Sequence, residues 1–252
     1  MTILEADMNF SASTAAPAKP LALVIGAGGG LGAAMVQVLS APGEHGIDSV
    51  LALGRATQPA IDYSDETSLQ NAAAWVASQC AAEGAELRLL IVASGFLHGE
   101  EGQPERSWTH LDPNYLSRVF LVNTIGPALV MKHFLPLLPR QGRCAAGFVS
   151  AKVGSIGDNA LGGWYGYRAA KAALNQLVKT AAIELKRRNL DALCVALHPG
   201  TVDTALSKPF AKTGLKLRPP EVAATELLAV LAGLEPAQTG ALVDYQGKVL
   251  PW

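Results

Sequence analysis

A tyrosine and a lysine four residues apart carry the most specific chemistry in this sequence. Tyr167 and Lys171 open a long run of residues with helical periodicity. Residues at this spacing lie on one face of a helix. An ammonium near a phenol stabilises the phenolate, and so lowers the tyrosine pKa from its reference value of about 10. Such a tyrosine can exchange a proton with a carbonyl or alcohol oxygen near neutral pH. The alternative is a chance pair of two common residues.

A glycine-rich loop, Gly26–Gly32, has the composition of a phosphate-binding turn. Gly26, Gly30 and Gly32, with Leu31 between the last two, lie between an apolar run and a helical pattern. Glycine permits backbone approaches that a Cβ would block. The N-terminus of a helix presents unpaired N–H groups and a partial positive charge, which suits a pyrophosphate. A plain tight turn is the alternative. No Lys–Ser/Thr pair follows, so a nucleotide-triphosphate loop is not supported.

The end of the second apolar run indicates which dinucleotide would bind. A carboxylate at this point commonly holds a ribose 2′-hydroxyl, whereas a 2′-phosphate needs a cation. The run ends in Leu53, Gly54 and Arg55, without an acid. A guanidinium can bind a phosphate through two hydrogen bonds. Arg55 therefore favours NADP(H) over NAD(H), unless it is an ordinary surface arginine.

Short apolar runs alternate with helix-length segments along the chain. The predicted strands are Leu21–Ile25, Ser49–Leu53, Leu87–Ala93, Gly147–Ser150, Leu193–Leu197 and Gly240–Val243, with a short seventh near Ala60–Asp62. The predicted helices are Leu31–Ser40, Ser64–Glu83, Pro113–Leu138, Tyr165–Arg188 and Pro220–Leu234. Continuous apolar strands are typical of parallel sheets covered on both faces. We expect an α/β fold: a single-domain, Rossmann-like, doubly wound parallel sheet of about seven strands. Ligands bind such sheets beyond the carboxyl ends of the strands.

Composition limits the classes of protein to which this chain can belong. Its 252 residues suit one large α/β domain, which we place at residues 19–252 after a flexible tail at residues 1–18. The net charge of −1 gives no reason to expect nucleic acid or an anionic membrane as a partner. Three scattered cysteines without CxxC spacing predict a reduced, cytoplasmic protein with no disulfide framework and no metal site.

One apolar stretch, Leu21–Leu39, is nearly long enough to span a bilayer. Five of its residues are glycines, clustered between Gly26 and Gly32. Such a cluster would break a spanning helix. We therefore interpret the stretch as a buried strand, a tight loop and a buried helix.

These motifs together resemble the short-chain dehydrogenase/reductase family. The resemblance rests on the glycine loop, the Tyr167–Lys171 pair, Asn123 within Leu121–Thr124, and the run His198-Pro199-Gly200. Within the family the chain looks most like the carbonyl reductases similar to sniffer and C-factor. Three segments carry that closer likeness: Gly154–Asn159, Tyr167–Asn175 and Asp244–Trp252.

The resemblance implies roles for individual residues. Tyr167 would be the acid/base, Lys171 would lower its pKa and hold the nicotinamide ribose, and Asn123 would anchor a proton-relay water. The other implied cofactor contacts are Asp62 with the adenine amino group, Ala93 and Gly95 in the loop that lines the adenosine ribose, and Pro199, Gly200, Val202 and Thr204 along the nicotinamide. Each has a structural alternative. Asn123 could bridge backbone within a helix, Asp62 could start a helix, and Pro199-Gly200 could be only a turn.

The sequence departs from the family pattern at four positions. Ile25 replaces a usual threonine, Ala93 replaces an asparagine, and Gly29 stands where NADP-users often carry a basic residue. The most consequential departure is Ala151, at the position of the family's catalytic serine. That serine donates a hydrogen bond to the substrate oxygen, and the loss of such a donor can cost roughly 10²–10³ in rate.

Two nearby serines could replace the missing hydroxyl. Ser150 is adjacent to Ala151, but successive side chains on a strand point to opposite faces, so it could serve only if the strand ends early or its register slips. Ser155 is the other possible donor.

We therefore predict an NADPH-dependent reductase of a ketone or aldehyde, with Tyr167 as proton donor. The alternative is a catalytically weak or inactive NADP(H)-binding regulatory protein, because of Ala151. A serine hydrolase is disfavoured, since no GxSxG turn lies between a strand and a helix. Substrate contacts are expected from Phe96–Asp112 and Thr204–Leu217. The resemblance also implies a homodimer or homotetramer, formed through the two helices predicted at Pro113–Leu138 and Tyr165–Arg188.

Overall fold

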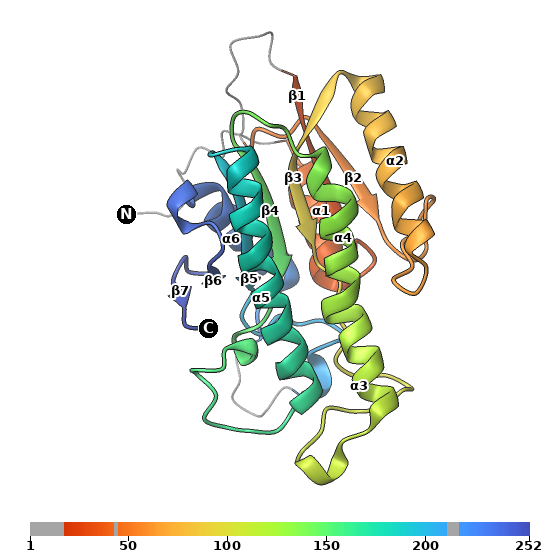
Figure 1. Ribbon diagram of the computed structural model, residues 1–252, viewed down its shortest axis with the longest axis vertical. Helices are drawn as coiled ribbons and strands as arrows, with labels where there is room; N and C mark the ends of the chain where they lie inside the picture. Colours follow the sequence, from red (N-terminus) through yellow and green to blue (C-terminus); the bar gives the residue numbers. More distant parts are fainter. Residues whose placement is uncertain (1–17, 43–44, 211–216) are drawn as a thin grey trace.

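The protein forms a seven-stranded sheet that is covered by helices on both faces (Figure 1). This computed structural model describes residues 18–42, 45–210 and 217–252. The predicted tail, apart from residue 18, lies outside the described residues. The same holds for residues 211–216 of the predicted substrate segment Thr204–Leu217.

The strands lie in the order β2-β1-β3-β4-β5-β6-β7. Their bounds are β1 Lys19–Ile25, β2 Ser49–Leu53, β3 Ala85–Val92, β4 Cys144–Val149, β5 Ala192–His198, β6 Leu242–Asp244 and β7 Val249–Leu250. Strands β1 to β6 are parallel, and β7 pairs antiparallel with β6. The predicted doubly wound α/β fold is confirmed, with one edge strand reversed.

The seventh strand predicted near Ala60–Asp62 is wrong. Those residues have no regular secondary structure and pair with no strand, and their one backbone bond to the end of β2 runs from the Ile61 N–H to the Gly54 carbonyl (2.9 Å). Pro59, directly before them, has no N–H to donate. A run of three residues after a proline is too short to make a row of ladder bonds, so the apolar Ile61 is buried without becoming a strand.

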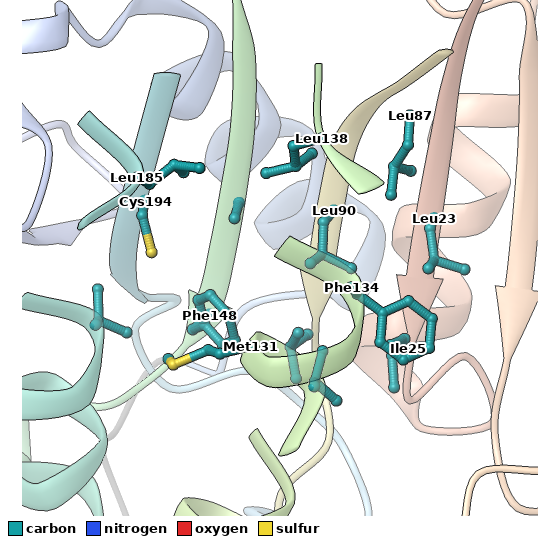
Figure 2. Packing of buried hydrophobic residues seen from close by; sticks show 14 of the residues in the cluster. Leu23, Ile25, Leu87, Leu90, Met131, Phe134, Leu138, Phe148, Leu185 and Cys194 are labelled. Atoms are coloured by element: carbon teal, nitrogen blue, oxygen red, sulfur yellow. The ribbon is translucent and has the colours of Figure 1, made fainter. Parts of the chain in front are cut away.

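The two faces of the sheet explain the continuous apolar runs. Leu23 and Ile25 of β1 point to one face, and Ala22 and Val24 point to the other. The first face is covered by α2 (Glu66–Glu83), α4 (Gly126–Phe134) and α5 (Tyr165–Arg188), and the second by α1 (Gly30–Ser40) and α6 (Pro220–Gly233). Figure 2 shows the first core, where Phe134 of α4 and Phe148 of β4 fill the space between helices and sheet.

The helix predicted at Pro113–Leu138 is continuous but not uniform. It consists of α3 (Pro113–Phe120), a π-helical turn η2 (Leu121–Ile125), α4 and a 3-10 turn η3 (Leu135–Leu137). Among the described residues, Pro113–Leu137 is the one helical stretch long and apolar enough to cross a membrane by length and composition. Here it packs Val130 and Phe134 against the sheet, as a core helix does.

The remaining short helices are η1 (Trp108–His110), η4 (Lys152–Gly154), η5 (Lys208–Phe210) and η6 (Pro236–Gln238). Because the parallel strands end at one edge of the sheet, the segments that follow β1 to β5 gather there, at the lower end of the view in Figure 1. The residues with candidate chemistry lie in these segments.

Candidate active site

Tyr167 and Lys171 lie one turn apart near the start of α5, beside the end of β4. The Lys171 ammonium donates a hydrogen bond to the Val149 carbonyl (2.9 Å) and lies 5.7 Å from the centroid of the Tyr167 ring. Tyr167 is 7% exposed and Lys171 is 2% exposed. The two side chains therefore share one helix face, as their spacing predicts, and both are withdrawn from solvent.

The predicted lowering of the tyrosine pKa is not what this structure shows. Burial raises the pKa of Tyr167 above its ordinary value of 10.0. Burial also lowers the pKa of Lys171 from 10.5 to about 7. The charged form of each group is disfavoured when water is removed. The phenol therefore keeps its proton at neutral pH, which suits a proton donor.

The segment after β4 carries no hydroxyl at Ala151. Strand β4 ends at Val149, before Ser150, so the strand does end early. The Ser150 hydroxyl is nevertheless committed elsewhere, because it donates to Asn175 Oδ1 (2.6 Å) in the interior. Asn175 lies two helical turns beyond Tyr167, so this bond holds Ser150 at the far end of the Tyr167–Lys171 pair.

The second serine, Ser155, is buried and acts as a hydrogen-bond acceptor, which leaves its O–H free to donate. Ser155 is 1% exposed, and its hydroxyl oxygen accepts a hydrogen bond from the Asp158 N–H (3.2 Å). Among the described residues, neither predicted substitute makes a hydrogen bond with Tyr167, and Ala151 has only a methyl group.

Asn123 sits in the π turn between α3 and α4. It is fully buried. Its Nδ2 donates to the Phe96 carbonyl (2.7 Å) and to the Val119 carbonyl (3.0 Å), and its Oδ1 accepts from the Phe96 N–H (3.1 Å). The Val119 bond is the bridge within the helix that the structural alternative predicted, and the Phe96 bonds, which that alternative did not include, join the helix to the segment after β3.

The glycine loop is packed too closely for side chains. A Cβ on Gly32 would lie 2.2 Å from the Gly26 carbonyl oxygen, and one on Gly26 would lie 2.6 Å from the Ser94 nitrogen. A Cβ on Gly30 would lie 2.8 Å from the side-chain methyl of Thr204. The loop is thus pressed against the segments that follow β3 and β5, and only glycine fits these contacts.

The N-terminus of α1 remains available to an anion. Its N-cap residue is Gly29, no side chain caps the helix, and its first turn contains no acid. Leu31 is buried beneath this turn. Nothing lies within 4 Å of the Cβ position at Gly28, so the outer side of the loop is open. The residues present therefore fit a dinucleotide pyrophosphate.

The groups predicted to bind the adenosine half lie exposed beyond β2. Arg55 is exposed, and within the described part of the chain its guanidinium has no ion pair. Asp62 is also exposed, and hydrogen bonds from Ser64 lower its pKa. It does not start α2, because the cap of that helix is Asp65. Beyond β2 the structure thus places one exposed cation, Arg55, and one exposed carboxylate, Asp62, which is hydrogen-bonded to Ser64.

The segment after β3 is tied to its neighbours. The Ala93 N–H donates to the Ile25 carbonyl (2.8 Å), and Gly95 lies beside the Asn123 amide oxygen. The Tyr63 and Ser94 hydroxyls are 2.5 Å apart, and burial raises the pKa of Tyr63 to about 12. This contact braces the loop that in the family carries an asparagine at Ala93.

The segment after β5, Pro199–Thr204, packs closely against Tyr245 and Arg218. Gly200, directly after Pro199, has φ +72°, and a Cβ there would meet the Tyr245 ring at 3.0 Å. Val202 is buried and forms a β-bridge with Arg218. The Arg218 guanidinium stacks on Tyr245 at 3.6 Å and pairs with Glu226. Pro199–Thr204 is therefore held by packing as well as by its turn.

The sequence did not single out the aromatic residues that surround Tyr167. The Trp164 ring lies edge-on to Tyr167, with 6.1 Å between ring centroids, and edge-on to Phe210 at 5.3 Å. Phe210 in turn meets His98 at 5.3 Å. His98 and Phe210 come from the two segments predicted to contact substrate. Trp164 does not, and only its place just before the tyrosine helix could have indicated it.

Glu105 was also missed. It is an acidic residue that is only 2% exposed, and its carboxylate accepts from the Gly166 N–H at the start of α5. A signal was present in the sequence, because the long helix that carries Tyr167 is preceded by Trp164 rather than by a capping residue.

Comparison with known proteins agrees with this geometry. A family model described as short chain dehydrogenase matches residues 20–214. The C-signal protein of Myxococcus xanthus is 34% identical over 137 residues, which are 54% of this chain and 78% of that protein. The 1-hydroxy-2-glutathionyl-2-methyl-3-butene dehydrogenase of a Rhodococcus species is 30% identical over 237 residues, which are 91% of this chain and 98% of that protein.

Solved structures give the same result. An NADPH-bound carbonyl reductase from chicken fatty liver superposes with a TM-score of 0.79 at 27% identity, covering 93% of this chain and 99% of that one. The carbonyl reductase Sniffer of D. melanogaster superposes with a TM-score of 0.77 at 23% identity, with the same coverage. The likeness to the sniffer and C-factor group predicted from the sequence is confirmed.

Proposed function

Because this chain belongs to the short-chain dehydrogenase family, we propose that it reduces a ketone or aldehyde with NADPH, using Tyr167 as the proton donor. One observation carries the proposal. The buried Tyr167–Lys171 pair lies at the carboxyl edge of the sheet, where the uncapped start of α1 also lies. That edge is where parallel sheets bind dinucleotides.

Each residue contributes a separate step. When bound, NADPH supplies the hydride that adds to the carbonyl carbon. Tyr167 gives its phenolic proton to the carbonyl oxygen, so that the products are an alcohol and NADP⁺. Burial raises the pKa of Tyr167, so the phenol is protonated before the carbonyl is reduced. Lys171, anchored on the Val149 carbonyl, would hold the nicotinamide ribose.

The choice of NADPH rests on Arg55. The start of α1 binds the pyrophosphate of either dinucleotide, whereas an exposed guanidinium beyond β2 favours the one that carries a 2′-phosphate. The NADPH-bound carbonyl reductase from chicken fatty liver, at 27% identity, supports the same choice.

A second function is favoured by Ala151. Ala151 has no hydroxyl and the Ser150 hydroxyl donates to Asn175, so neither of these two residues can donate to a substrate carbonyl beside Tyr167. A protein that binds NADP(H) and responds to it without turnover would need no such donor. This candidate shares the cofactor site and differs only in chemistry.

The test is turnover by the purified chain. We expect oxidation of NADPH, followed by the loss of its absorbance, with at least one of a panel of aldehydes, ketones and quinones. Tyr167→Phe is expected to lower turnover by about 10²–10⁴-fold while leaving the NADPH dissociation constant nearly unchanged. NADPH binding with no turnover on any carbonyl would support the regulatory candidate. Turnover that is unaffected by Tyr167→Phe would refute the assigned proton donor.

A further inference from the structure

The turn that leads into α5 has an uncommon backbone. Gly162, Gly163 and Trp164 are three successive residues with positive φ, at +64°, +64° and +55°. Glycine adopts this region freely, whereas a bulky side chain does so only when its surroundings enforce it. Trp164 is the one non-glycine residue with positive φ in the described part of the chain. Something must therefore hold Trp164 in place.

Glu105, through its backbone, and Arg168, through its side chain, hold this turn from two sides. On one side, the Glu105 backbone carbonyl accepts a hydrogen bond from the Trp164 N–H (2.6 Å). On the other, Arg168 donates to the Gly163 carbonyl (2.9 Å) and to the Gly162 carbonyl (3.2 Å). The left-handed residues are thus bonded at both ends.

Glu105 also supplies the cap that α5 lacks. Trp164 is the N-cap residue, and an indole has no acceptor for the unpaired N–H groups of the first turn. Both carboxylate oxygens of Glu105 lie 3.1 Å from the N–H of Gly166, the second residue of the helix. This N–H is the one that a local aspartate or serine would normally bind. The positive end of the helix stabilises the buried carboxylate in return.

The approach depends on Gly166 having no side chain. A Cβ there would lie 3.0 Å from Glu105 Oε1 and 2.9 Å from a Leu116 methyl. The carboxylate, the turn and the first residues of α5 thus form one packed unit. Tyr167 is the next residue along the helix, and Trp164 lies edge-on to it.

We infer that Glu105 is a positioning residue for Tyr167 and Trp164. Its backbone carbonyl accepts from the Trp164 N–H and its carboxylate accepts from the Gly166 N–H, and the carboxylate sets the start of α5 so that the indole forms one wall of the substrate site beside the phenol. The wall determines how bulky a carbonyl compound can reach Tyr167. This inference rests on the proposed function for its catalytic consequence, but the placement of Trp164 can be tested without any turnover.

The placement test uses the four tryptophans as separate probes. The protein is prepared with 5-fluorotryptophan, and the fluorine resonance of Trp164 is identified by its loss in Trp164→Phe. In Glu105→Ala we expect this resonance to shift or broaden, while those of Trp75, Trp108 and Trp252 stay. Glu105→Gln keeps an acceptor oxygen and should keep the native resonance. Glu100→Ala removes an exposed acid from the same loop and is the matched control.

The resonances also give the results that overturn the inference. Glu105→Ala keeps the backbone bond to the Trp164 N–H, so an unmoved Trp164 resonance would show that the Glu105 carboxylate does not position the indole. Movement of all four resonances would show a general loss of structure rather than positioning. Since no substrate is present, either result stands whether or not the protein is a reductase.

The kinetic test compares benzaldehyde with propanal, a bulky and a small probe. Glu105→Ala is expected to lower kcat/KM by about tenfold to a hundredfold, as a misplaced catalytic group does, with the NADPH dissociation constant unchanged. It should also change the ratio of kcat/KM between the two probes, as Trp164→Ala does. If Glu105 acts on selectivity through Trp164, Glu105→Ala added to Trp164→Ala leaves that ratio where Trp164→Ala alone puts it. Additive changes in the ratio would overturn this part.

Discussion

The N-termini of α1 and α5 lie at the same edge of the sheet, but only that of α5 is capped by a side chain. Helix α1 begins after Gly29, with no side-chain cap and no acid in its first turn. Helix α5 begins after Trp164, and the buried carboxylate of Glu105 binds the N–H of Gly166. Both ends carry the same partial positive charge from their backbone. The difference lies in whether the protein supplies its own anion.

This difference gives the two helix ends different roles in the candidate site. At α1 the unpaired N–H groups are left for the phosphates of a cofactor. At α5 a protein carboxylate already occupies that place, so the helix contributes the positions of Tyr167 and Lys171 rather than an anion site. The first arrangement needs only backbone and glycine, and the second depends on contacts between residues that are far apart in the sequence.

The largest effect is expected on kcat, from restoring the hydroxyl that is missing at Ala151, near the start of α5. Ala151→Ser places a hydroxyl at the position that lacks one and should raise kcat by about 10²-fold, the usual worth of a donor to a developing oxyanion. The measurement is steady-state reduction of a carbonyl by NADPH. In a Tyr167→Phe background the same substitution should give no gain, because the proton donor is absent. Equal gains in both backgrounds would contradict the shared site.

The next effect concerns the cofactor side. Arg55→Ala removes the exposed cation beyond β2. The preference for NADPH over NADH, measured as a ratio of dissociation constants, should fall by about tenfold to a hundredfold, the worth of a hydrogen bond to a charged group. Arg187→Ala removes an exposed arginine from the far end of α5 and should leave the ratio unchanged. An unchanged ratio in Arg55→Ala would remove the case for NADPH.

A smaller change would make the start of α1 resemble that of α5. Gly29 has φ −86°, which any residue can adopt, and its Cβ position is 3.4 Å from the nearest atom, the Gly26 carbonyl oxygen. Gly29→Asp therefore caps the helix but adds a negative charge, and NADPH affinity should fall about tenfold through repulsion between the charges. Gly29→Asn caps without charge and should bind more tightly than Gly29→Asp. Equal affinities would show that the phosphates do not sit at this helix end.

The smallest effect is a dependence of stability on pH, which we attribute to Lys171 of α5. Burial lowers the pKa of Lys171 from 10.5 to about 7, so between these values the unfolded chain binds a proton that the folded chain does not. The free energy of unfolding of the cofactor-free protein should therefore rise with pH, by about 1 kcal/mol between pH 8 and pH 9.

Urea unfolding at several pH values measures this rise. Readings stop below pH 10, because the raised pKa of Tyr167 acts in the opposite direction above that value. Lys171→Met should flatten the profile, whereas helix α1 contains no titratable side chain. A rise of equal size in Lys171→Met would assign the effect to another group.

The parts of the fold that could be predicted are those whose cause is local. The unit formed by β1, the glycine loop and α1 reads directly as an apolar run, a set of glycines and a helical pattern. The strand expected near Ala60–Asp62 failed because an edge strand needs a row of bonds to its neighbour, and Pro59 and the short run do not provide one. Likewise β7 pairs antiparallel with β6, which its two residues could not reveal.

The site divides in the same way. That Tyr167 and Lys171 share a helix face follows from their spacing, but the direction of their pKa shifts follows from burial. The commitment of Ser150 to Asn175 depends on how β4 packs against α5. No pattern in the sequence distinguishes that bond from a free hydroxyl.

The sequence by itself determined the doubly wound fold, the glycine loop, the shared helix face of Tyr167 and Lys171, and the absence of a serine at Ala151, because residue type and short spacing set these. Only the tertiary structure decided that Glu105 caps α5 from 61 residues away and that Trp164 lies against Tyr167. The physical reason is that burial and capping depend on which surfaces meet. That is a property of the packed chain rather than of any segment within it.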